Sequence, residues 1–277
     1  MIDWPKLAKK IWNTLLDYIF PKFCLGCNKE GSYFCTECFK GVTLLKEQVC
    51  PICYRKNGLN GRVCKSCENA DFFLDGLWCA SSFEKNSLLR HCIHSFKYEF
   101  IEELALPLAK ILSQSFNETN AEKPDFGNCL ESFFEPAGLI CPAPLHPKRQ
   151  RFRGFNQTEL LADEFIKLNR GVLQKQQFLE RIYYHKPQME LKREDRIKNV
   201  ENAFRLSPQM SLQWGAGMSF KCSTTGDTSE FLPAEIPQNV ILLDDVATTL
   251  STLNACAKAL KKAGVKQVWG LVLARVF

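Results

Sequence analysis

The stretch that decides the fold is NVILLDDVATTLSTLNACAKA, residues 239–259. Its apolar run, residues 240–243, is too short for a buried helix and rich in branched side chains, which is typical of a strand inside a parallel sheet. Two carboxylates, Asp244 and Asp245, follow the run directly. Beyond them apolar residues recur at helical spacing as far as Gly264, a residue type that often follows a helix end. We therefore expect a strand, a short loop and a helix, in that order.

The loop between this strand and this helix is rich in hydroxyl groups, carried by Thr248, Thr249, Ser251 and Thr252. The first amides of a helix lack partners and its N-terminal end is electropositive, so an anion binds there readily. Carboxylates at the end of the strand can accept hydrogen bonds from sugar hydroxyls or hold hydrated Mg²⁺. The alternative is a buried strand with a self-capping polar turn, but the ordered set of acids and hydroxyls favours a binding site.

The composition is that of an ordinary globular protein: 277 residues, 45% hydrophobic and 24% charged, with a net charge of +6. This mild basic excess fits an anionic ligand and does not demand nucleic acid. No segment approaches the run of about 18–20 apolar residues that a membrane helix needs. Residues 1–22 have the pattern of an amphipathic helix, which could lie on a membrane surface, although packing on this protein or a partner is favoured.

Eight of the 14 cysteines form four CxxC pairs between residues 24 and 67, and the other six are scattered singly. Scattered single thiols argue against an oxidising compartment, so we expect a cytoplasmic protein without disulfides. Two CxxC turns complete a tetrahedral Zn²⁺ shell, so four turns predict two structural zinc sites. Iron–sulfur ligation is a rival, and redox CxxC pairs would need a thioredoxin-like context that is absent here. Sequential pairing gives one site from Cys24, Cys27, Cys35 and Cys38 and another from Cys50, Cys53, Cys64 and Cys67, with a cross-braced pairing as the alternative.

A basic run follows another predicted strand, residues 138–144, and contains Lys148, Arg149, Arg151 and Arg153 without any acid. Such a run is often a solvated loop. Its position after a strand and its match in charge to a polyphosphate favour an anion site. Further strands are predicted over residues 75–83 and 267–274, and helices over 86–98, over 101–116 and from Asn156 onward.

Several of these motifs together resemble the ComF/GntX family of phosphoribosyltransferase-like proteins. The loop after Asp245 is similar to the 5-phosphoribosyl-1-pyrophosphate (PRPP) loop of type I phosphoribosyltransferases. The family likeness rests on the cysteine pairs and on LLDYIFPKFCLGC (15–27), IHSFKY (93–98), PAPLHPKRQRFRGFNQTELLA (142–162), REDRIKNVENAF (193–204) and ILLDDVATTLSTL (241–253).

The resemblance implies an α/β fold of the type I phosphoribosyltransferase kind, a mainly parallel sheet flanked by helices, preceded by a small double zinc ribbon. It implies an N-terminal helix over 1–22, a ribbon over 23–72 and a phosphoribosyltransferase-like domain over 73–277. The regions near 117–136 and 207–238 would be insertions in that domain.

The resemblance also implies that PRPP binds with Mg²⁺. Asp244 and Asp245 would hold the ribose as catalytic residues, and Thr248, Thr249, Ser251 and Thr252 the 5′-phosphate. The pyrophosphate would contact Arg149, Arg151 and Arg153, together with Lys97 and Tyr98. Two positions depart from the family pattern: Leu250 stands where a glycine is usual, and Glu99-Phe100 replaces a glycine-containing turn.

The function implied is a PRPP- and Mg²⁺-binding protein associated with competence and DNA uptake, a phosphoribosyltransferase of unknown acceptor. The alternative is a non-enzymatic zinc-ribbon adaptor that contacts single-stranded DNA or a helicase-like partner. A third hypothesis, motivated by Leu250, is a degenerate fold retained for interaction.

Overall fold

The computed structural model describes residue 4 and residues 19–56, 60–85, 87–122, 138–169, 173–183, 203–215 and 236–276. The helix expected over residues 1–22 lies almost wholly outside these described residues. So do most of the two expected insertions and most of the motif at residues 193–204.

The described part of the chain alternates strands and helices, as the apolar patterns predict. The strands are β1 (Gly76–Ser82), β2 (Gly138–Pro142), β3 (Leu173–Lys175), β4 (Leu179–Arg181), β5 (Phe204–Leu206), β6 (Asn239–Ala247) and β7 (Gln267–Arg275). The helices are α2 (Thr36–Lys40), α3 (Leu88–Tyr98), α4 (Ala105–Glu122), α6 (Pro147–Arg153), α7 (Gln157–Leu168), α9 (Pro208–Gly215) and α10 (Ser251–Lys262), with short 3-10 turns η1 (Lys65–Cys67) and η2 (Glu102–Leu104).

Five strands form a parallel sheet in the order β1-β7-β6-β2-β3, and β4 and β5 form a separate antiparallel ribbon. β6 is the central strand, with β7 on one side and β2 on the other. In a parallel sheet the carboxyl ends of the strands meet at one edge. The acids near the end of β6 therefore lie next to the segment that leaves β2 and carries the basic run.

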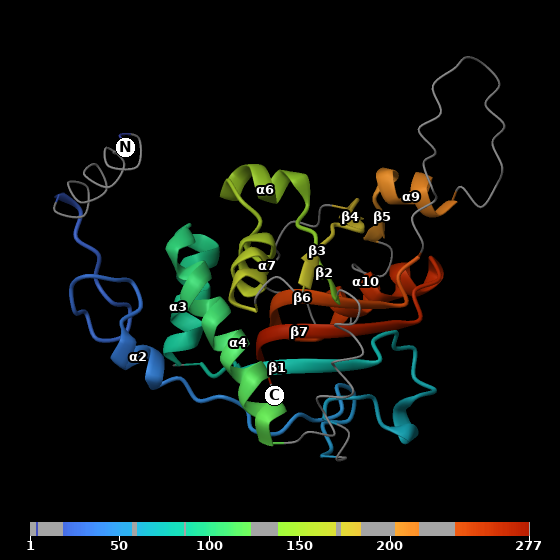
Figure 1. Cartoon of the computed structure of the whole chain (residues 1–277), viewed down its shortest axis with the longest axis horizontal. Helices are drawn as coiled ribbons and strands as arrows, with labels where there is room; N and C mark the ends of the chain where they lie inside the picture. The colour runs from blue at the N-terminus through green and yellow to red at the C-terminus, as the bar shows by residue number, and fades with distance from the viewer. Residues whose placement is uncertain are drawn as a thin grey trace.

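The sheet is buried on both faces, which explains the continuous apolar runs in its strands. One face packs against α3, α4 and α7, which lie together in Figure 1, and includes Trp78 and Trp269. The other face packs against α10 and the β4–β5 ribbon and includes Leu242 and Val272. Neighbouring residues of β6 alternate between these two clusters, so the strand places consecutive side chains on opposite faces.

The free edge of β1 is covered by the zinc-ribbon segment. The Leu45 N–H donates to the Ala80 carbonyl at 2.9 Å. The buried Gln48 side chain forms two bonds with Cys79: its Nε2 donates to the carbonyl at 3.0 Å, and its Oε1 accepts from the N–H at 2.9 Å. An uncovered edge strand is a template for unwanted pairing. The ribbon segment therefore shields the sheet as well as carrying the cysteines.

Two predicted local structures differ from those observed. The basic run is a helix, α6, rather than a loop: Pro147 occupies its first turn, the His146 side chain caps it, and Gly154 ends it in the left-handed conformation at φ 81°. α4 continues to Glu122, six residues past the helix end expected at residue 116, because the polar residues there extend the helix instead of starting a loop. The C′ role of Gly264 is confirmed by its φ of 105° just after α10.

Candidate functional site

The two carboxylates at the end of β6 are the centre of the candidate site. Because side chains alternate along the strand, Asp244 and Asp245 leave β6 toward opposite faces of the sheet. Asp245 is buried on the side of α3, and Asp244 is half-buried. The Cys256 thiol of α10 lies near Asp244, whose negative charge adds to burial in raising the pKa of that thiol. Both acids line a cavity of about 200 Å³. The acids thus meet at this cavity although their side chains start in opposite directions.

Lys97, in the last turn of α3, is the counter-ion of Asp245. Its Nζ lies 2.7 Å from Asp245 Oδ1, and the two side chains are 20% and 9% exposed. Burial by itself lowers the pKa of Lys97, but the charge and hydrogen bond of Asp245 outweigh burial and leave that pKa raised. Burial and the charge of Asp245 raise the pKa of Asp244 to about 7, while Lys97 opposes this shift. At neutral pH the combined negative charge of Asp244 and Asp245 is therefore larger than the single positive charge of Lys97.

The hydroxyl-rich loop lies between these acids and α10. The Thr249 and Ser251 hydroxyls are hydrogen-bonded to each other at 2.8 Å, whereas Thr248 is exposed. The loop and the first residues of α10 surround a small hollow of about 30 Å³. Thr252 and Asp244 line both this hollow and the 200 Å³ cavity, so the two spaces adjoin.

Leu250 adopts the backbone conformation for which glycine is suited. Its φ is 60° and its ψ is 3°, the left-handed region that disfavours residues with a Cβ. Its side chain is only 6% exposed and belongs to the apolar cluster that includes Leu253 and Met210. The leucine side chain therefore packs into the core beneath the loop, and burial offsets the backbone strain. The departure from glycine does not by itself change the path of the loop.

The helical form of α6 determines which of the predicted arginines meet the acids. Arg149 and Arg153 are four residues apart, so they share one face of the helix, and both line the cavity with Asp244 and Asp245. Arg151 is exposed and does not line this cavity. The interpretation of the run as a loop made the three arginines equivalent, but the helix separates them.

Arg153 is held in place by two contacts. Its guanidinium donates to Gln157 Oε1 at 2.8 Å and lies over the Tyr98 ring, 5.1 Å from the ring centre. Burial and the nearby positive charge of Arg149 lower the pKa of Arg153, while Tyr98 and Asp245 oppose the shift. The Arg153 guanidinium remains a cation at neutral pH. A bound anion would offset the unfavourable effects of burial and of the Arg149 charge on this cation.

The start of α7 supplies buried polar groups that the sequence did not single out. Asn156 caps the helix: its Oδ1 accepts from the Thr158 N–H at 3.3 Å, and its side-chain amide donates to Glu159 Oε1 at 2.9 Å. Gln157 is 2% exposed, lines the cavity, and its Nε2 has no hydrogen-bond partner among the described residues. A buried amide donor without a partner is rare in native proteins and fits a ligand acceptor in the cavity.

The eight clustered cysteines form two compact groups of four, with the sulfur atoms of each group all within 4.8 Å of one another. The groups follow the sequential pairing and exclude the cross-braced one. Such spacing fits a tetrahedral Zn²⁺ shell, in which sulfur atoms about 2.3 Å from the metal lie about 3.8 Å apart. Burial raises the pKa of Cys24, but the backbone N–H groups of Cys35, Cys27 and Gly26 outweigh it and bring that pKa to about 6, which favours the thiolate that a metal requires. The donor set therefore fits two structural zinc ions.

The two cysteine groups are joined to the α/β domain by specific contacts. In the first, a Cβ added to Gly26 would lie 2.7 Å from the Leu88 side chain of α3, so this knuckle packs closely on the helix that carries Lys97. In the second, the buried Arg275 at the end of β7 donates to the Pro51 carbonyl at 2.6 Å and lies over the Tyr54 ring. The zinc segment is thus attached to both α3 and the sheet.

Comparison with known proteins agrees with both parts of this architecture. Residues 15–68 match the family model described as a double zinc ribbon domain. The chain is 33% identical over 138 residues to Competence protein F of Haemophilus influenzae, which covers 49% of this chain and 50% of that protein. It is 25% identical over 243 residues to Competence protein ComFC of Bacillus subtilis, covering 87% and 82%. Against ComFC of Streptococcus pneumoniae it is 24% identical over 259 residues, covering 89% of each chain.

The chain is therefore similar to the ComF competence proteins. The alignments with the two ComFC proteins span most of the chain, so the family likeness includes the α/β domain as well as the zinc ribbon. The chain spans about half the length of the Haemophilus protein that it matches. None of the described helices has the length and apolar character needed to cross a membrane.

One arginine that sequence reasoning missed lies at the same cavity. Arg181 ends β4, lines the cavity with Arg149 and Arg153, and has a buried Nε without a partner among the described residues. Burial and the charge of Arg149 lower the pKa of Arg181. The available signal was a cation shortly after the apolar residues Phe178 and Leu179, but nothing in the sequence indicated which other residues this stretch would face.

Proposed function

We propose that the α/β domain binds PRPP together with Mg²⁺, and that the protein acts in DNA uptake; its relatives are named as competence proteins. The proposal keeps residues 23–72 as the zinc-ribbon domain and 73–277 as the PRPP-binding domain. The observation that carries it is the cavity in which Asp244 and Asp245 of β6 meet Arg149 and Arg153 of α6. Paired acids next to converging arginines match a ligand that combines a polyol with a polyphosphate.

Each residue type suits one part of PRPP. The ribose hydroxyls would donate to the acids, and the 5′-phosphate would accept from the loop of residues 248–252 at the start of α10. The pyrophosphate would lie against Arg149, Arg153 and Arg181, with Lys97 and Tyr98 at the same wall. Arg151 has no place in this arrangement because it does not line the cavity.

The reaction supported by this arrangement is displacement at the anomeric carbon. An acceptor atom forms a bond to that carbon while the bond from the carbon to the pyrophosphate oxygen breaks, and pyrophosphate leaves with the electron pair. The arginines would stabilise the charge that develops on the leaving group. Asp244 and Asp245 are carboxylates suited to hydrated Mg²⁺, which when bound neutralises pyrophosphate oxygens.

Calorimetric titration with PRPP and Mg²⁺ tests this function. We expect binding that requires Mg²⁺ and is lost in the Asp244→Asn/Asp245→Asn variant. Arg153→Gln should weaken binding by about 10–100-fold, the value of a charge-assisted hydrogen bond. Arg151→Gln is the matched control on the same helix and should bind nearly as tightly as the parent. A folded parent protein without PRPP affinity, or equal losses in the two arginine variants, would contradict the proposal.

A second candidate function, an adaptor for single-stranded DNA, is favoured by the outer surface of α6. Phe152 is 80% exposed among the cations of this helix, and its ring meets Phe100 edge-on at 6.0 Å. Exposed aromatic rings among cations are a stacking surface for unpaired bases. Salt-sensitive binding of an oligonucleotide that is reduced in Phe152→Ala but kept in the Asp244→Asn/Asp245→Asn variant would support an adaptor, which could also engage a helicase-like partner. DNA binding that needs the two acids would count against it.

A further inference from the structure

A groove of about 330 Å³ lies between strand β5 and helix α10, apart from the candidate PRPP cavity. Its lining residues are 204–206 of β5 and, on α10, Ala255, Lys258, Ala259, Lys262 and Ala263, and we call it the β5 groove. None of these residues lines the 200 Å³ cavity or the small hollow at the hydroxyl-rich loop. A ligand of the β5 groove would therefore bind without using the residues assigned to PRPP.

One wall of the β5 groove is an open strand edge. Among the described strands β5 pairs with β4 alone, in antiparallel register. The Ser207 N–H donates to the Phe178 carbonyl at 2.8 Å, two residues along the strand from Arg205. Because hydrogen-bonded pairs alternate along an antiparallel ladder, Arg205 also bonds toward β4, and the peptide groups of Phe204 and Leu206 point away from it. These outward peptide groups have no backbone partner in the described part of the chain.

This open edge is held in position by its own side chains. Phe204 belongs to the apolar cluster on the α10 face of the sheet, and Leu206 packs against that cluster. Both residues also line the β5 groove, so their outward N–H and carbonyl groups lie at its wall. Unpaired groups along a strand edge are a template for an extended chain, which gains main-chain hydrogen bonds by adding a strand.

The opposite wall, on α10, combines small side chains with lysines. Ala255 and Ala259 are four residues apart, so they lie on one face of the helix and leave space for side chains of an added strand. Lys258 and Lys262 have the same spacing and flank this space. Lys258 Nζ lies 5.2 Å from the centre of the Phe73 ring, whereas Lys262 is exposed.

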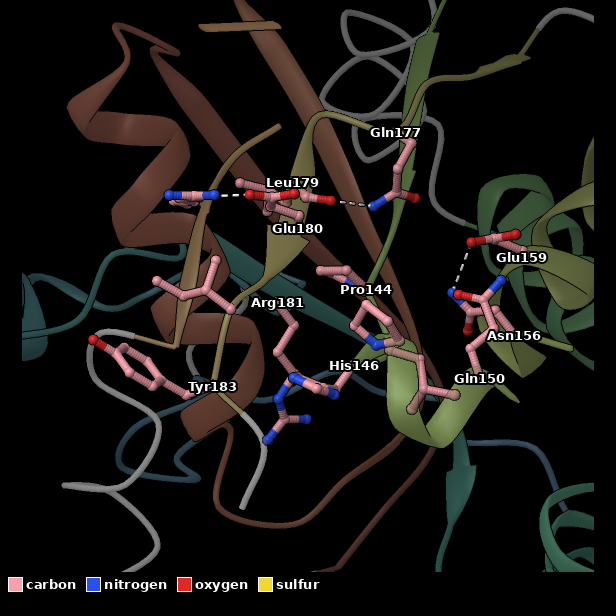
Figure 2. A pocket seen from close by; sticks show the side chains of 14 residues that line it. Pro144, His146, Gln150, Asn156, Glu159, Gln177, Leu179, Glu180, Arg181 and Tyr183 are labelled. Carbon is pink, nitrogen blue, oxygen red and sulfur yellow. Dashed lines mark hydrogen bonds and ion pairs between the residues drawn. The ribbon is translucent and has the colours of Figure 1, made fainter. Parts of the chain in front are cut away.

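The charges that line the β5 groove are all positive. Arg205, Lys258 and Lys262 line it, and no carboxylate of the described residues does. Arg205 is already compensated, because Glu180 on β4 accepts from its Nε at 2.5 Å; Figure 2 shows Glu180 with this ion pair as a dashed line. The two lysines therefore dominate the charge that a ligand would meet, and an acidic ligand complements them.

We propose that the β5 groove is a docking site for an acidic, extended segment of a partner protein, which adds a third strand to the β4–β5 ribbon. The backbone of this segment pairs with Phe204 and Leu206. Side chains of a strand alternate between its two faces, so small apolar side chains pack on Ala259 while carboxylates meet Lys258 and Lys262. The proposal does not depend on PRPP binding.

Amide hydrogen exchange, measured by NMR on the full zinc-loaded chain, tests the open edge. In the free protein the Phe204 and Leu206 amides should exchange faster than the Arg205 amide, which belongs to the ladder with β4. A short synthetic peptide that alternates glutamate with valine, blocked at both ends, should slow exchange at the first two positions and leave Arg205 unchanged. Slow exchange at all three positions in the free protein would mean that another segment of this chain already pairs with the edge, which overturns the proposal.

Two control peptides separate strand addition from simple charge attraction. The same peptide with every backbone amide N-methylated keeps its charge but has no N–H donors, and it should not bind. A peptide with lysine in place of glutamate keeps the backbone but reverses the charge, and it should not bind either. Equal binding of the N-methylated peptide overturns strand addition, and equal binding of the lysine peptide overturns the acidic partner.

A matched pair of variants tests the position of the site. Lys262→Glu and Lys266→Glu make the same charge change at two exposed residues, of which only the first lines the β5 groove. In about 0.15 M salt, where the Debye length is about 8 Å, Lys262→Glu should weaken peptide binding about fivefold, the upper end for one exposed ion pair. Lys266→Glu should bind the peptide nearly as the parent does.

The outcomes of this titration are distinct from those of the PRPP titration. Calorimetric PRPP binding should be the same in Lys262→Glu as in the parent, because Lys262 lines neither space assigned to PRPP. A parent protein without PRPP affinity contradicts the proposed function and leaves the peptide result to be read by itself. Equal weakening in Lys262→Glu and Lys266→Glu, or no binding of the acidic peptide to the parent, overturns the docking site.

Discussion

Replacing Leu250 by alanine and by glycine tests how the loop before α10 is stabilised. The side chain is 6% exposed in the apolar cluster on the α10 face, so Leu250→Ala should destabilise the protein by about 2–5 kcal/mol. Leu250→Gly loses the same packing but gains relief from a φ of 60°, worth about 1–2 kcal/mol for a residue with a Cβ. The added flexibility of glycine in the unfolded chain takes back about 0.5–1 kcal/mol. We therefore expect the glycine variant to be about 0.5–1 kcal/mol more stable than the alanine variant.

Urea denaturation followed by far-ultraviolet circular dichroism, with zinc present throughout, gives the midpoints to compare. Ala259→Gly in α10 is the control, since at a helical φ glycine should cost about 1 kcal/mol relative to alanine. A glycine variant at position 250 that is less stable than the alanine variant would refute the assignment of strain to this residue. Because the backbone already has the conformation that suits glycine, PRPP affinity in Leu250→Gly should stay close to that of the parent.

Three further predictions follow from the acids, their counter-ion and the cysteines. The folded-state pKa of Asp244 is raised to about 7 from 3.8, so the parent protein should lose stability as the pH rises from about 4 to 7. Asp244→Asn should not show this loss. A difference between the denaturation midpoints of parent and variant that stays constant across this range would contradict the raised pKa. Lys97→Met leaves the buried Asp245 carboxylate without its ammonium partner and should destabilise the protein by about 3–5 kcal/mol in urea denaturation. The double variant Lys97→Met/Asp245→Asn should recover most of that stability. No recovery would mean that Lys97 acts through packing alone. Cys27→Ser and Cys53→Ser, one in each cysteine group, should each lower bound zinc from two ions to one per chain in elemental analysis, and an unchanged metal content in either would contradict the two separate sites.

The sequence alone was sufficient wherever the structure depends on neighbours along the chain. Two CxxC turns bring their own thiols together, so the positions of eight cysteines predicted the zinc ligands, although their pairing was left open. The apolar run at residues 240–243 and the glycine at 264 marked β6 and the end of α10, because burial on both faces and a left-handed C′ residue leave local patterns. The family likeness in these motifs was confirmed by the zinc-ribbon match and by the relatives.

The tertiary structure decided which of the polar residues meet. Arg149, Arg151 and Arg153 are equivalent in a list of charges, and only the formation and placement of α6 direct the first and third toward Asp244 and Asp245. Arg181 joins them from a strand that is 28 residues further along the chain than Arg153, a proximity that depends on how the β4–β5 ribbon folds over β2 and β6. Leu250 is tolerated in a glycine conformation because a core cluster assembled from distant segments receives its side chain. Spacing along the chain determines local geometry, but charge and burial at this site arise from contacts between segments far apart in sequence, so those properties had to be read from the folded protein.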